Sequence, residues 1–478
     1  MDKLKSKLRE LFGIDVRSLA LFRIGLALIL LWDLAMRVQD LKAHYTDEGI
    51  MPRSVLVEKI VHPWTLSLHL ANGTWEFQLV LFVLAALFAL ALLFGYKTRL
   101  MTFLSWAFVI SLQSRNPLNN QGGDIVLRLL LFWAMFLPLG ACWSLDQRLS
   151  KKSPPQNQIV SGGTFALLMQ VCFIYWFAAI LKLDPAWTTN GTAIWYALSI
   201  EQFATPFGNY LLNYPSFLRI ATFLTLYFEG FGPLFAFSPI WTGPIRMATV
   251  VCFILFHLLG LNLAMELTHF SYVCAIGWLV FIPEWFWNRV LKWPASTIVP
   301  WKASWLSNIL AIFFLMFVFV WNTRSLNKPT FHLPPLVNAG MDNIGMLLRI
   351  DQYWNMFSPF PIREDGWYVI PGKLRDGTEV DLFKDGAPLT WDKPPLLSAT
   401  YKNDRWRSYM INLWFFDEDR EVLLPIYADY LCRQWNMNHE YSKQLLSFDI
   451  DFMLKINNIE EPPMVPEKVV MWQQQCAE

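Results

Sequence analysis

Long runs of apolar residues, separated by short polar stretches, occupy the first two thirds of the chain. A helix needs roughly 20 mostly apolar residues to cross a bilayer, and by that rule the sequence predicts about nine transmembrane helices. The expected segments are residues 18–36, 75–94, 100–114, 124–140, 164–182, 218–237, 247–266, 268–283 and 304–322. The pattern therefore predicts a polytopic α-helical membrane bundle.

A different pattern begins near residue 325, where polar and apolar positions alternate over short distances. Alternation with a period of two, interrupted by turn residues, is typical of strands joined by hairpins. The turn Arg375-Asp376-Gly377 separates two such stretches, Trp367–Leu374 and Thr378–Phe383. Three further elements are expected: strands at Tyr409–Phe416 and Phe448–Ile456, and a helix near Tyr427–Trp435.

These two patterns predict two domains. Residues 1–324 would form the transmembrane helical domain, and residues 325–478 a small α+β domain packed on one face of the bundle. The proline-rich stretch Asn327–Pro335 would be the linker between them.

Lysine and arginine set the expected orientation. Basic residues lie at the N-terminus and in alternate loops: Lys3, Lys5, Lys7, Arg9, Lys97, Arg99, Arg148, Lys151, Lys152, Arg246, Arg289, Lys292 and Lys302. With nine helices all of them fall on one side, which the positive-inside rule assigns to the cytoplasm. We therefore expect a protein of the inner (cytoplasmic) membrane with a cytoplasmic N-terminus and an extracytoplasmic C-terminal domain.

Composition agrees with a membrane protein. Residues are 55% hydrophobic and only 16% charged, with a mean hydropathy of +0.32, against roughly 25% charged residues in a soluble domain. The net charge of +1 and the absence of a basic stripe argue against nucleic acid as a partner. The expected partners are the lipid bilayer and an extracytoplasmic protein or peptide substrate.

The six cysteines show no CxxC spacing, so no zinc or other metal site is expected. Cys432 and Cys476 lie in the polar C-terminal part and could form a disulfide if that part lies in an oxidising compartment. The basic amphipathic start, MDKLKSKLRELF, is followed by an apolar run without a small-residue cleavage site, so no cleavable signal peptide is expected.

Lys182 is the first candidate for chemistry, because it closes the apolar segment Thr164–Leu181. An ionisable residue within a membrane is costly and therefore suggests a functional site. Burial favours the neutral amine and would make this lysine a base. The alternative is that its side chain extends from a helix end into the lipid headgroups.

Other charged residues also fall within the predicted helices. Arg23 and Asp33 are ten residues apart and are expected near a shared helix face, and Asp124 and Arg128 have the i,i+4 spacing of a pair. Two more such residues are Glu229 and His257. Each of them alone would be a structural ion pair more often than a catalytic group, but together they predict a polar interior cavity.

The loop Asn119-Asn120-Gln121-Gly122-Gly123-Asp124 leads into the fourth segment. Its glycines allow a tight turn and a close approach of the backbone. The loop could bind a polar group at the mouth of the bundle, or it could be an ordinary turn with Asp124 as a helix cap.

Five motifs in this order carry a resemblance: LFRIGLALILLWDL, NNQGGDIVLRLLLF, WFAAILKLDPAWTTNG, FHLLGLNLAMELTHFSYV followed by IPEW, and YWNMFSPFP. Together they resemble the vitamin K-dependent gamma-carboxylase family and, more broadly, the bacterial HTTM (horizontally transferred transmembrane) domain proteins. The motifs span about residues 15–385.

The resemblance implies a function for these motifs. Lys182 stands at the position of the carboxylases' catalytic lysine, and Leu183-Asp184 and Trp187 follow it as in that family. Such enzymes use a reduced vitamin K-type naphthoquinone, such as menaquinol, with oxygen and carbon dioxide to carboxylate a peptide glutamate. The implied catalytic set is Lys182, Asn120, Gln121 and His257, and the implied cofactor-binding set is Trp187, Asp124 and Trp354.

Two departures limit the analogy. Gln121 stands where the carboxylases have a histidine, and glutamine cannot carry a proton. The C-terminal part is also much shorter than in the animal enzymes. Two alternatives therefore remain: a non-catalytic membrane protein that binds a quinone or lipid and assists maturation of a secreted partner, and, less favoured because no inverted repeat is evident, a transporter.

Overall fold

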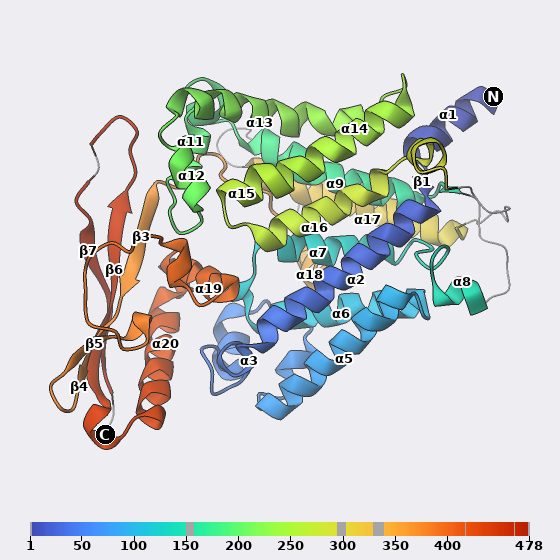
Figure 1. Ribbon diagram of the computed structural model, residues 1–478. Coiled ribbons are helices and arrows are strands. Elements are labelled where there is room, and N and C mark those ends of the chain that lie inside the picture. The colour runs from blue at the N-terminus through green and yellow to red at the C-terminus, as the bar shows by residue number, and fades with distance from the viewer. Residues whose placement is uncertain are drawn as a thin grey trace.

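The computed structural model describes residues 2–149, 157–293, 303–327, 339–415, 417–462 and 464–476. Helices from the first two thirds of the chain lie side by side in a bundle, and a β-sheet lies across one end of it (Figure 1). The N-terminus is at the opposite end of the bundle from the sheet (Figure 1).

Each of the nine expected membrane segments contains a helix. In the described part of the chain, five helical stretches are long and apolar enough to cross a membrane: α2 (Val16–Val38), α5 (Trp75–Phe94), α9 (Gly162–Leu181), Thr242–Ala264, which begins with α14 (Thr242–Leu255), and Trp305–Leu326, which begins with α17 (Trp305–Thr323). The other four segments hold helices that are shorter or less apolar: α6 (Thr98–Arg115), α7 (Gly122–Ala134), α13 (Pro215–Phe235) and α16 (Thr268–Trp278). Nine membrane crossings thus remain a prediction, whereas the described residues form a mostly helical protein with five candidate apolar spans.

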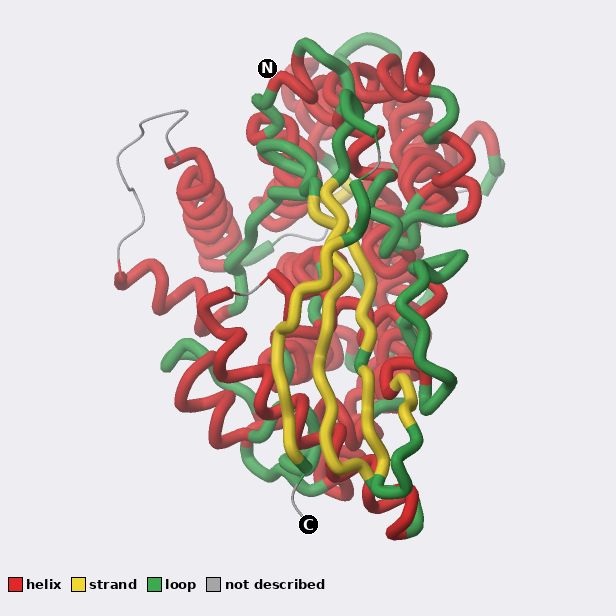
Figure 2. Tube along the Cα trace, turned by 90° about the vertical axis from the view of Figure 1, so that its left-hand side faces the viewer, coloured by secondary structure: helices red, strands yellow, loops and turns green. Residues whose placement is uncertain are grey.

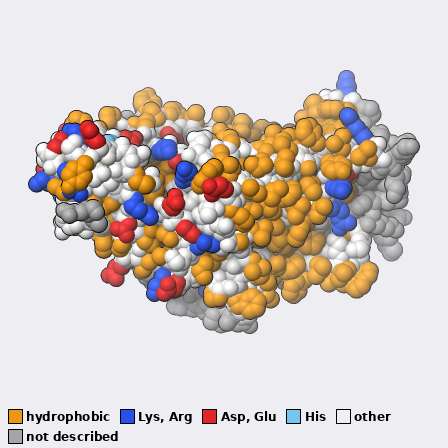
Figure 3. Space-filling model, turned by 90° about the horizontal axis from the view of Figure 1, so that it is seen from below, with side chains coloured by type: hydrophobic (Ala, Val, Ile, Leu, Met, Phe, Trp, Pro, Cys, Tyr) orange, Lys and Arg blue, Asp and Glu red, His pale blue; other side chains and the backbone are white. Residues whose placement is uncertain are grey.

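The surface of the bundle matches a bilayer. Figure 3 shows apolar side chains covering the middle of the molecule, charges of both signs over the sheet end, and lysine and arginine side chains at the other end. On α5, for example, Val80, Val83 and Leu87 are exposed. An exposed apolar surface of this extent is stable in lipid rather than in water.

Short helices cover the end of the bundle that carries the sheet. They are α3 (Leu41–Tyr45), α10 (Pro185–Thr188), α11 (Ala193–Leu198) and α12 (Pro206–Leu211). At the opposite end lie α1 (Asp2–Phe12) and a short antiparallel pair, β1 (Ile14–Asp15) with β2 (Gln158–Ile159).

The C-terminal sheet is entirely antiparallel and is built around one long strand, β6 (Leu445–Ile456). One edge of β6 pairs with β3 (Glu364–Val369) and β4 (Pro371–Leu374), and β5 (Glu379–Asp381) continues the sheet from β4. The other edge pairs with β7 (Glu467–Gln475). Figure 2 views the sheet face on, with the helices behind it.

The expected elements of this region are confirmed in part. The hairpin around residues 375–377 forms between β4 and β5, β6 contains the expected strand at Phe448–Ile456, and α20 (Asp417–Asn438) contains the expected helix. The expected strand Tyr409–Phe416 is wrong, because residues 409–415 belong to α19 (Asp404–Phe415), while Phe416 lies outside the described residues. Their nearly continuous apolar run does not distinguish a strand from a buried helix.

The helices α19 and α20 lie between the sheet and the bundle (Figure 1). Their apolar side chains, including Tyr409 and Leu413, share one core with the inner face of the sheet and with Ile50 and Leu118 from loops of the bundle. A disulfide joins Cys432 of α20 to Cys476, just after β7. The C-terminal region is therefore packed directly on the bundle. All of the expected linker Asn327–Pro335 except Asn327 lies outside the described residues, so the domain boundary stays a prediction.

Asp365 of β3 joins the sheet to the loop that follows α11. Its carboxylate accepts hydrogen bonds from the backbone N–H of Glu201 (2.9 Å) and from Nε2 of Gln202 (3.3 Å). Burial raises the pKa of Asp365 to about 6, and the nearby Glu201 carboxylate contributes in the same direction. Lys393 and Lys455 pair with Glu201 rather than with Asp365.

This raised pKa predicts a pH dependence of stability. Between about pH 4, where an unfolded aspartate titrates, and about pH 6, the folded protein holds a proton that the unfolded chain releases, so stability falls as pH rises through this window. Asp365→Asn should remove up to about 3 kcal/mol of this fall. The measurement is the free energy of unfolding of both chains in detergent at pH 4.5 and pH 7.5. An equal change in the free energy of unfolding of both chains between the two pH values would contradict the assignment, because the contributions of all other titrating groups cancel when the two chains are compared.

Candidate functional site

An apolar cavity of about 340 Å³ lies at the end of α9 nearest the sheet. Its walls come from α9, from α13 and from the π-helical turn η4 (Phe256–Leu261) that continues α14. Lys182, Glu229, Tyr175 and His257 place their polar groups in this mostly apolar lining. A volume of this size, mostly apolar with a few polar groups, is typical of a small-molecule site.

Lys182 is the residue that ends α9, and only 3% of it is exposed. Its Nζ forms an ion pair with the carboxylate of Glu229 and lies 4.8 Å from the centre of the Trp187 ring. A lysine that extended into the headgroups would be exposed, so this alternative is wrong for the described structure. Lys182 instead lies in a buried pair of opposite charges with an aromatic face beside it.

Small residues line the contact between α9 and α13 beside Lys182 and Glu229. A Cβ added at Gly230 of α13 would lie 3.8 Å from the Cβ of Ala179 of α9, an ordinary van der Waals contact. Small residues at a membrane helix contact allow the backbones to approach. The two charged side chains, one turn of α9 further on and one residue earlier in α13, therefore reach each other inside the protein.

A second polar group lies on the same helix face. Tyr175 precedes Lys182 by seven residues, or two helical turns. Its hydroxyl lies 2.6 Å from Nε2 of His257 and accepts a hydrogen bond of 2.8 Å from the Trp278 indole. With Trp278 as donor, the tyrosine proton is free to bond to His257. The π-helical turn holds His257 in this position, and such turns occur often at functional sites.

The other ring nitrogen of His257, Nδ1, is buried and has no hydrogen-bond partner among the described residues. A buried polar atom without a partner is costly unless a ligand or water satisfies it. His257 lines the cavity, so a ligand polar group is a suitable partner.

Trp187 connects the cavity to the C-terminal region. Its indole N–H donates to the backbone carbonyl of Phe357 at 2.8 Å. Phe357 has a φ of 55°, a left-handed conformation that is unfavourable for a phenylalanine. Phe357 and its neighbour Met356 line the cavity, so the YWNMFSPFP motif contributes to the wall.

Trp354 of the same motif does not reach the cavity. It is buried in the bundle core and donates from its indole to Oε1 of Gln352, which also accepts from Gln170. Trp354 is therefore a packing residue that holds the motif in the bundle core and does not line the cavity.

Asn120 and Gln121 also lie outside the cavity lining. The Asn120 amide donates to the carbonyl of Gln113 (2.7 Å), and Gln121 forms a capping box with Asp124 at the start of α7. A Cβ added at the next residue, Gly122, would lie 3.4 Å from the ring of Phe270, which lines the cavity. The loop therefore supports the cavity wall from the outside.

Asp124 belongs to a buried ionic cluster that joins the bundle to α19. Its carboxylate accepts hydrogen bonds from Arg37 (2.6 Å) and from Arg405 (2.6 Å), and the same two arginines pair with Asp33. All four side chains are buried. The cluster contains two positive and two negative charges and is therefore neutral.

One expected pairing is wrong: Arg128 does not pair with Asp124 but with Asp351 at 2.7 Å. Arg23 and Asp33 were expected near a shared helix face, and Arg23 donates to backbone carbonyls that include Leu139 and Trp143. Partners from other elements of the fold compete for these charges.

The cluster resembles a metal site only in composition. Ligand atoms of Asp33, Asp124 and His269 lie within 4.8 Å of one another. Arg37 and Arg405 already neutralise both carboxylates, and a divalent cation there would face two guanidinium groups. These residues are better explained as structural.

Comparison with known families decides the assignment. The family model of the HTTM domain matches residues 13–285, more than half of the chain. The chain belongs to the HTTM family. No curated protein and no solved structure matches it.

The HTTM domain match covers every helix that lines the cavity. Sequence reasoning had placed Lys182, Trp187 and His257 in the site, and the structure brings these three together. It had noted Glu229 without assigning it a role and had missed Tyr175. The seven-residue spacing from Tyr175 to Lys182 was a usable signal, since it places both on one helix face.

Proposed function

We propose that this HTTM protein is a membrane enzyme that uses Lys182 as a general base on a lipid-soluble hydroquinone, in a reaction related to glutamate γ-carboxylation. The observation that carries the proposal is the Lys182–Glu229 pair, buried at the end of a membrane helix inside an apolar cavity. A helix bundle that only anchored a domain would gain nothing from this costly arrangement.

The cavity suits a substrate that arrives through the bilayer. Three of its lining residues, Phe207, Phe217 and Leu259, are also exposed on the outside of the bundle. An apolar cavity edged by exposed apolar side chains gives a lipid-tailed molecule a route from the membrane without crossing water.

The polar groups suit proton transfer. In the ion pair Lys182 is an ammonium, so it acts as a base only after passing that proton to the Glu229 carboxylate; the neutral amine can then take a proton from a substrate hydroxyl. The His257–Tyr175 pair can hold or pass a second proton, with His257 Nδ1 free to bond to a substrate oxygen. The apolar lining excludes water, which strengthens each of these interactions.

A reduced naphthoquinone fits these residues, with its ring among apolar side chains and a hydroxyl near Lys182. When bound it would supply the reducing equivalents that, with oxygen, drive removal of a γ-proton from glutamate. Asn120 and Gln121 have no role in this proposal, because neither lines the cavity. The glutamate would reach Lys182 from the side that carries the sheet.

The test is a search for the quinone and for its turnover. The protein is purified in mild detergent, bound quinones are extracted and identified by mass spectrometry, and oxidation of added menaquinol is followed with and without carbon dioxide and a glutamate peptide. We expect bound quinone and turnover that depends on oxygen. Absence of both would reject the proposal, and turnover without incorporation of labelled carbon dioxide would retain the base chemistry but reject carboxylation.

A second candidate is a non-catalytic quinone- or lipid-binding protein that assists maturation of a secreted partner. Gln121 in place of the carboxylase histidine favours it, since a group expected to assist the reaction is missing. This candidate predicts that a neutral residue at position 182 preserves secretion of the partner, whereas the enzyme proposal predicts loss.

A further inference from the structure

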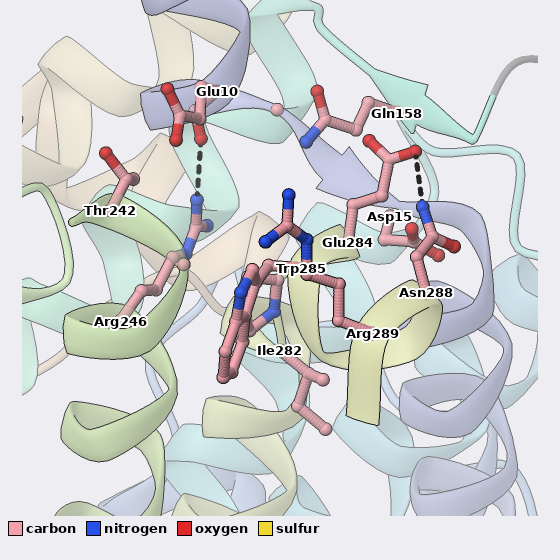
Figure 4. Close-up of a pocket in the computed structure, with 13 residues that line it drawn as sticks. Glu10, Asp15, Gln158, Thr242, Arg246, Ile282, Glu284, Trp285, Asn288 and Arg289 are labelled. Atoms are coloured by element: carbon pink, nitrogen blue, oxygen red, sulfur yellow. Dashed lines mark hydrogen bonds between the residues drawn. The ribbon is translucent and has the colours of Figure 1, made fainter. Parts of the chain in front are cut away.

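A second cavity, of about 260 Å³, lies at the opposite end of the bundle (Figure 4). Three candidate spans begin here: Asp15 precedes α2, Gln158 lies shortly before α9, and Thr242 begins α14. Because membrane helices begin at the bilayer surface, this cavity lies at the level of the lipid headgroups. The helix α9 separates it from Lys182 by roughly 30 Å.

The start of α14 is the one of these three that lacks a side-chain cap. Asp15 caps α2 and Ser161 caps α9, whereas no described side chain accepts a hydrogen bond from the first residues of α14. Uncapped N–H groups at a helix start carry partial positive charge and attract anions. The first two residues of α14, Thr242 and Gly243, line the cavity.

A buried arginine adds a full positive charge to this helix start. Arg246 lines the cavity and is 2% exposed. Its Nη1 donates to the backbone carbonyls of Glu10 and Leu11, but Nε and Nη2 have no hydrogen-bond partner among the described residues. Arg246 is the fifth residue of α14, one turn beyond its start, and a buried cation there is costly unless an anion compensates it.

Arg289 completes the positive side of the cavity. It is exposed and has no hydrogen-bond or ion-pair partner in the described part of the chain. Figure 4 shows its guanidinium group pointing into the cavity between Arg246 and Glu284. Two arginines that have no carboxylate partner among the described residues, beside an uncapped helix start, form a site for a phosphate group.

The acidic residues of the cavity are not equivalent. Asp15 is paired with Arg17 (2.7 Å) and Glu10 with Lys7 (2.8 Å). Glu284 accepts hydrogen bonds only from the neutral amides of Asn157 (3.0 Å) and Asn288 (3.2 Å) among the described residues. A carboxylate without a cationic partner therefore faces the same cavity as the two arginines.

We propose that this cavity binds the headgroup of a phospholipid that carries both a phosphate and a primary ammonium group. The phosphate binds Arg246, Arg289 and the start of α14, and the ammonium binds Glu284. The lipid tails lie along the apolar surface of the adjoining helices. This site is independent of the chemistry at Lys182, so either proposal can fail alone.

The test measures binding to the full-length protein in detergent. Short-chain phosphatidylethanolamine, phosphatidylglycerol and inorganic phosphate are titrated in turn, and the shift of the thermal unfolding midpoint gives each affinity. Wild type should bind phosphatidylethanolamine most tightly. Arg289→Gln, at an exposed position that should not disturb folding, should weaken this binding about tenfold. Glu284→Gln should remove the preference over phosphatidylglycerol.

Arg99→Gln is the matched control. Arg99 is another exposed arginine at the start of a helix at this end of the bundle, but it does not line the cavity, so its loss should leave binding unchanged. Equal binding by wild type and Arg289→Gln would overturn the site. An equal shift with inorganic phosphate would overturn its assignment to a lipid, and equal weakening by Arg99→Gln would show general charge attraction instead.

Discussion

Arg405→Ala should lower the free energy of unfolding by about 3–5 kcal/mol, the usual cost of removing one partner from a buried ionic group. Arg405 donates to Asp124 and to the backbone carbonyl of Asn119 (3.0 Å), and it pairs with Asp33. Without it, two buried carboxylates share the single charge of Arg37. The measurement is denaturant unfolding in detergent, followed by tryptophan fluorescence.

Two further variants identify the cause. Arg433 also connects the C-terminal region to the bundle, but it is exposed and makes one hydrogen bond to the carbonyl of Glu48 (3.2 Å), so Arg433→Ala should cost less than about 1 kcal/mol. Asp33→Asn should reduce the cost of Arg405→Ala, because one unpaired charge is then absent. Equal costs in both backgrounds would show that Arg405 acts through packing and not through charge.

Lys182→Ala should reduce hydroquinone turnover at least about 100-fold, the lower range for loss of a general base. Binding of the quinone should change little, since most of the cavity lining is apolar. The measurement is the initial rate of menaquinol oxidation at matched protein concentration, together with the quinone content of each preparation. Full turnover in the variant would reject the role of Lys182 as base.

The alanine variant leaves Glu229 buried without its partner, so loss of folding has to be separated from loss of chemistry. The double variant Lys182→Met with Glu229→Gln removes both charges and should remain folded but inactive. Lys373→Ala removes an exposed lysine of the C-terminal region and should retain full activity.

The sequence predicted what depends on local pattern. Apolar length located the helices of the bundle, and an isolated lysine at the end of such a run located the cavity. Alternation of polar and apolar positions over several residues located the long strand β6. The helix α19 was mistaken for a strand, because Tyr409–Phe416 is apolar at almost every position and carries no period.

The sequence did not predict which charged residues pair when they lie in distant segments. Lys182 and Glu229 are 47 residues apart, and Asp124 and Arg405 are 281 apart. A charge at a membrane position indicates that some partner exists, but the fold decides which of several candidates reaches it. The expected partner of Asp124 was near in sequence, whereas the structure supplies Arg405 from the C-terminal region.

The ionic cluster also determines when the buried charges are neutralised during synthesis of the chain. Asp33 and Asp124 emerge early in translation, while Arg405, which neutralises both, follows Asp124 by 281 residues. At about 5–20 residues per second, the ribosome needs roughly 15–60 s to make that stretch. During this interval Asp33, Asp124 and Arg37 together carry one excess negative charge, so the cluster becomes neutral only once α19 has been made.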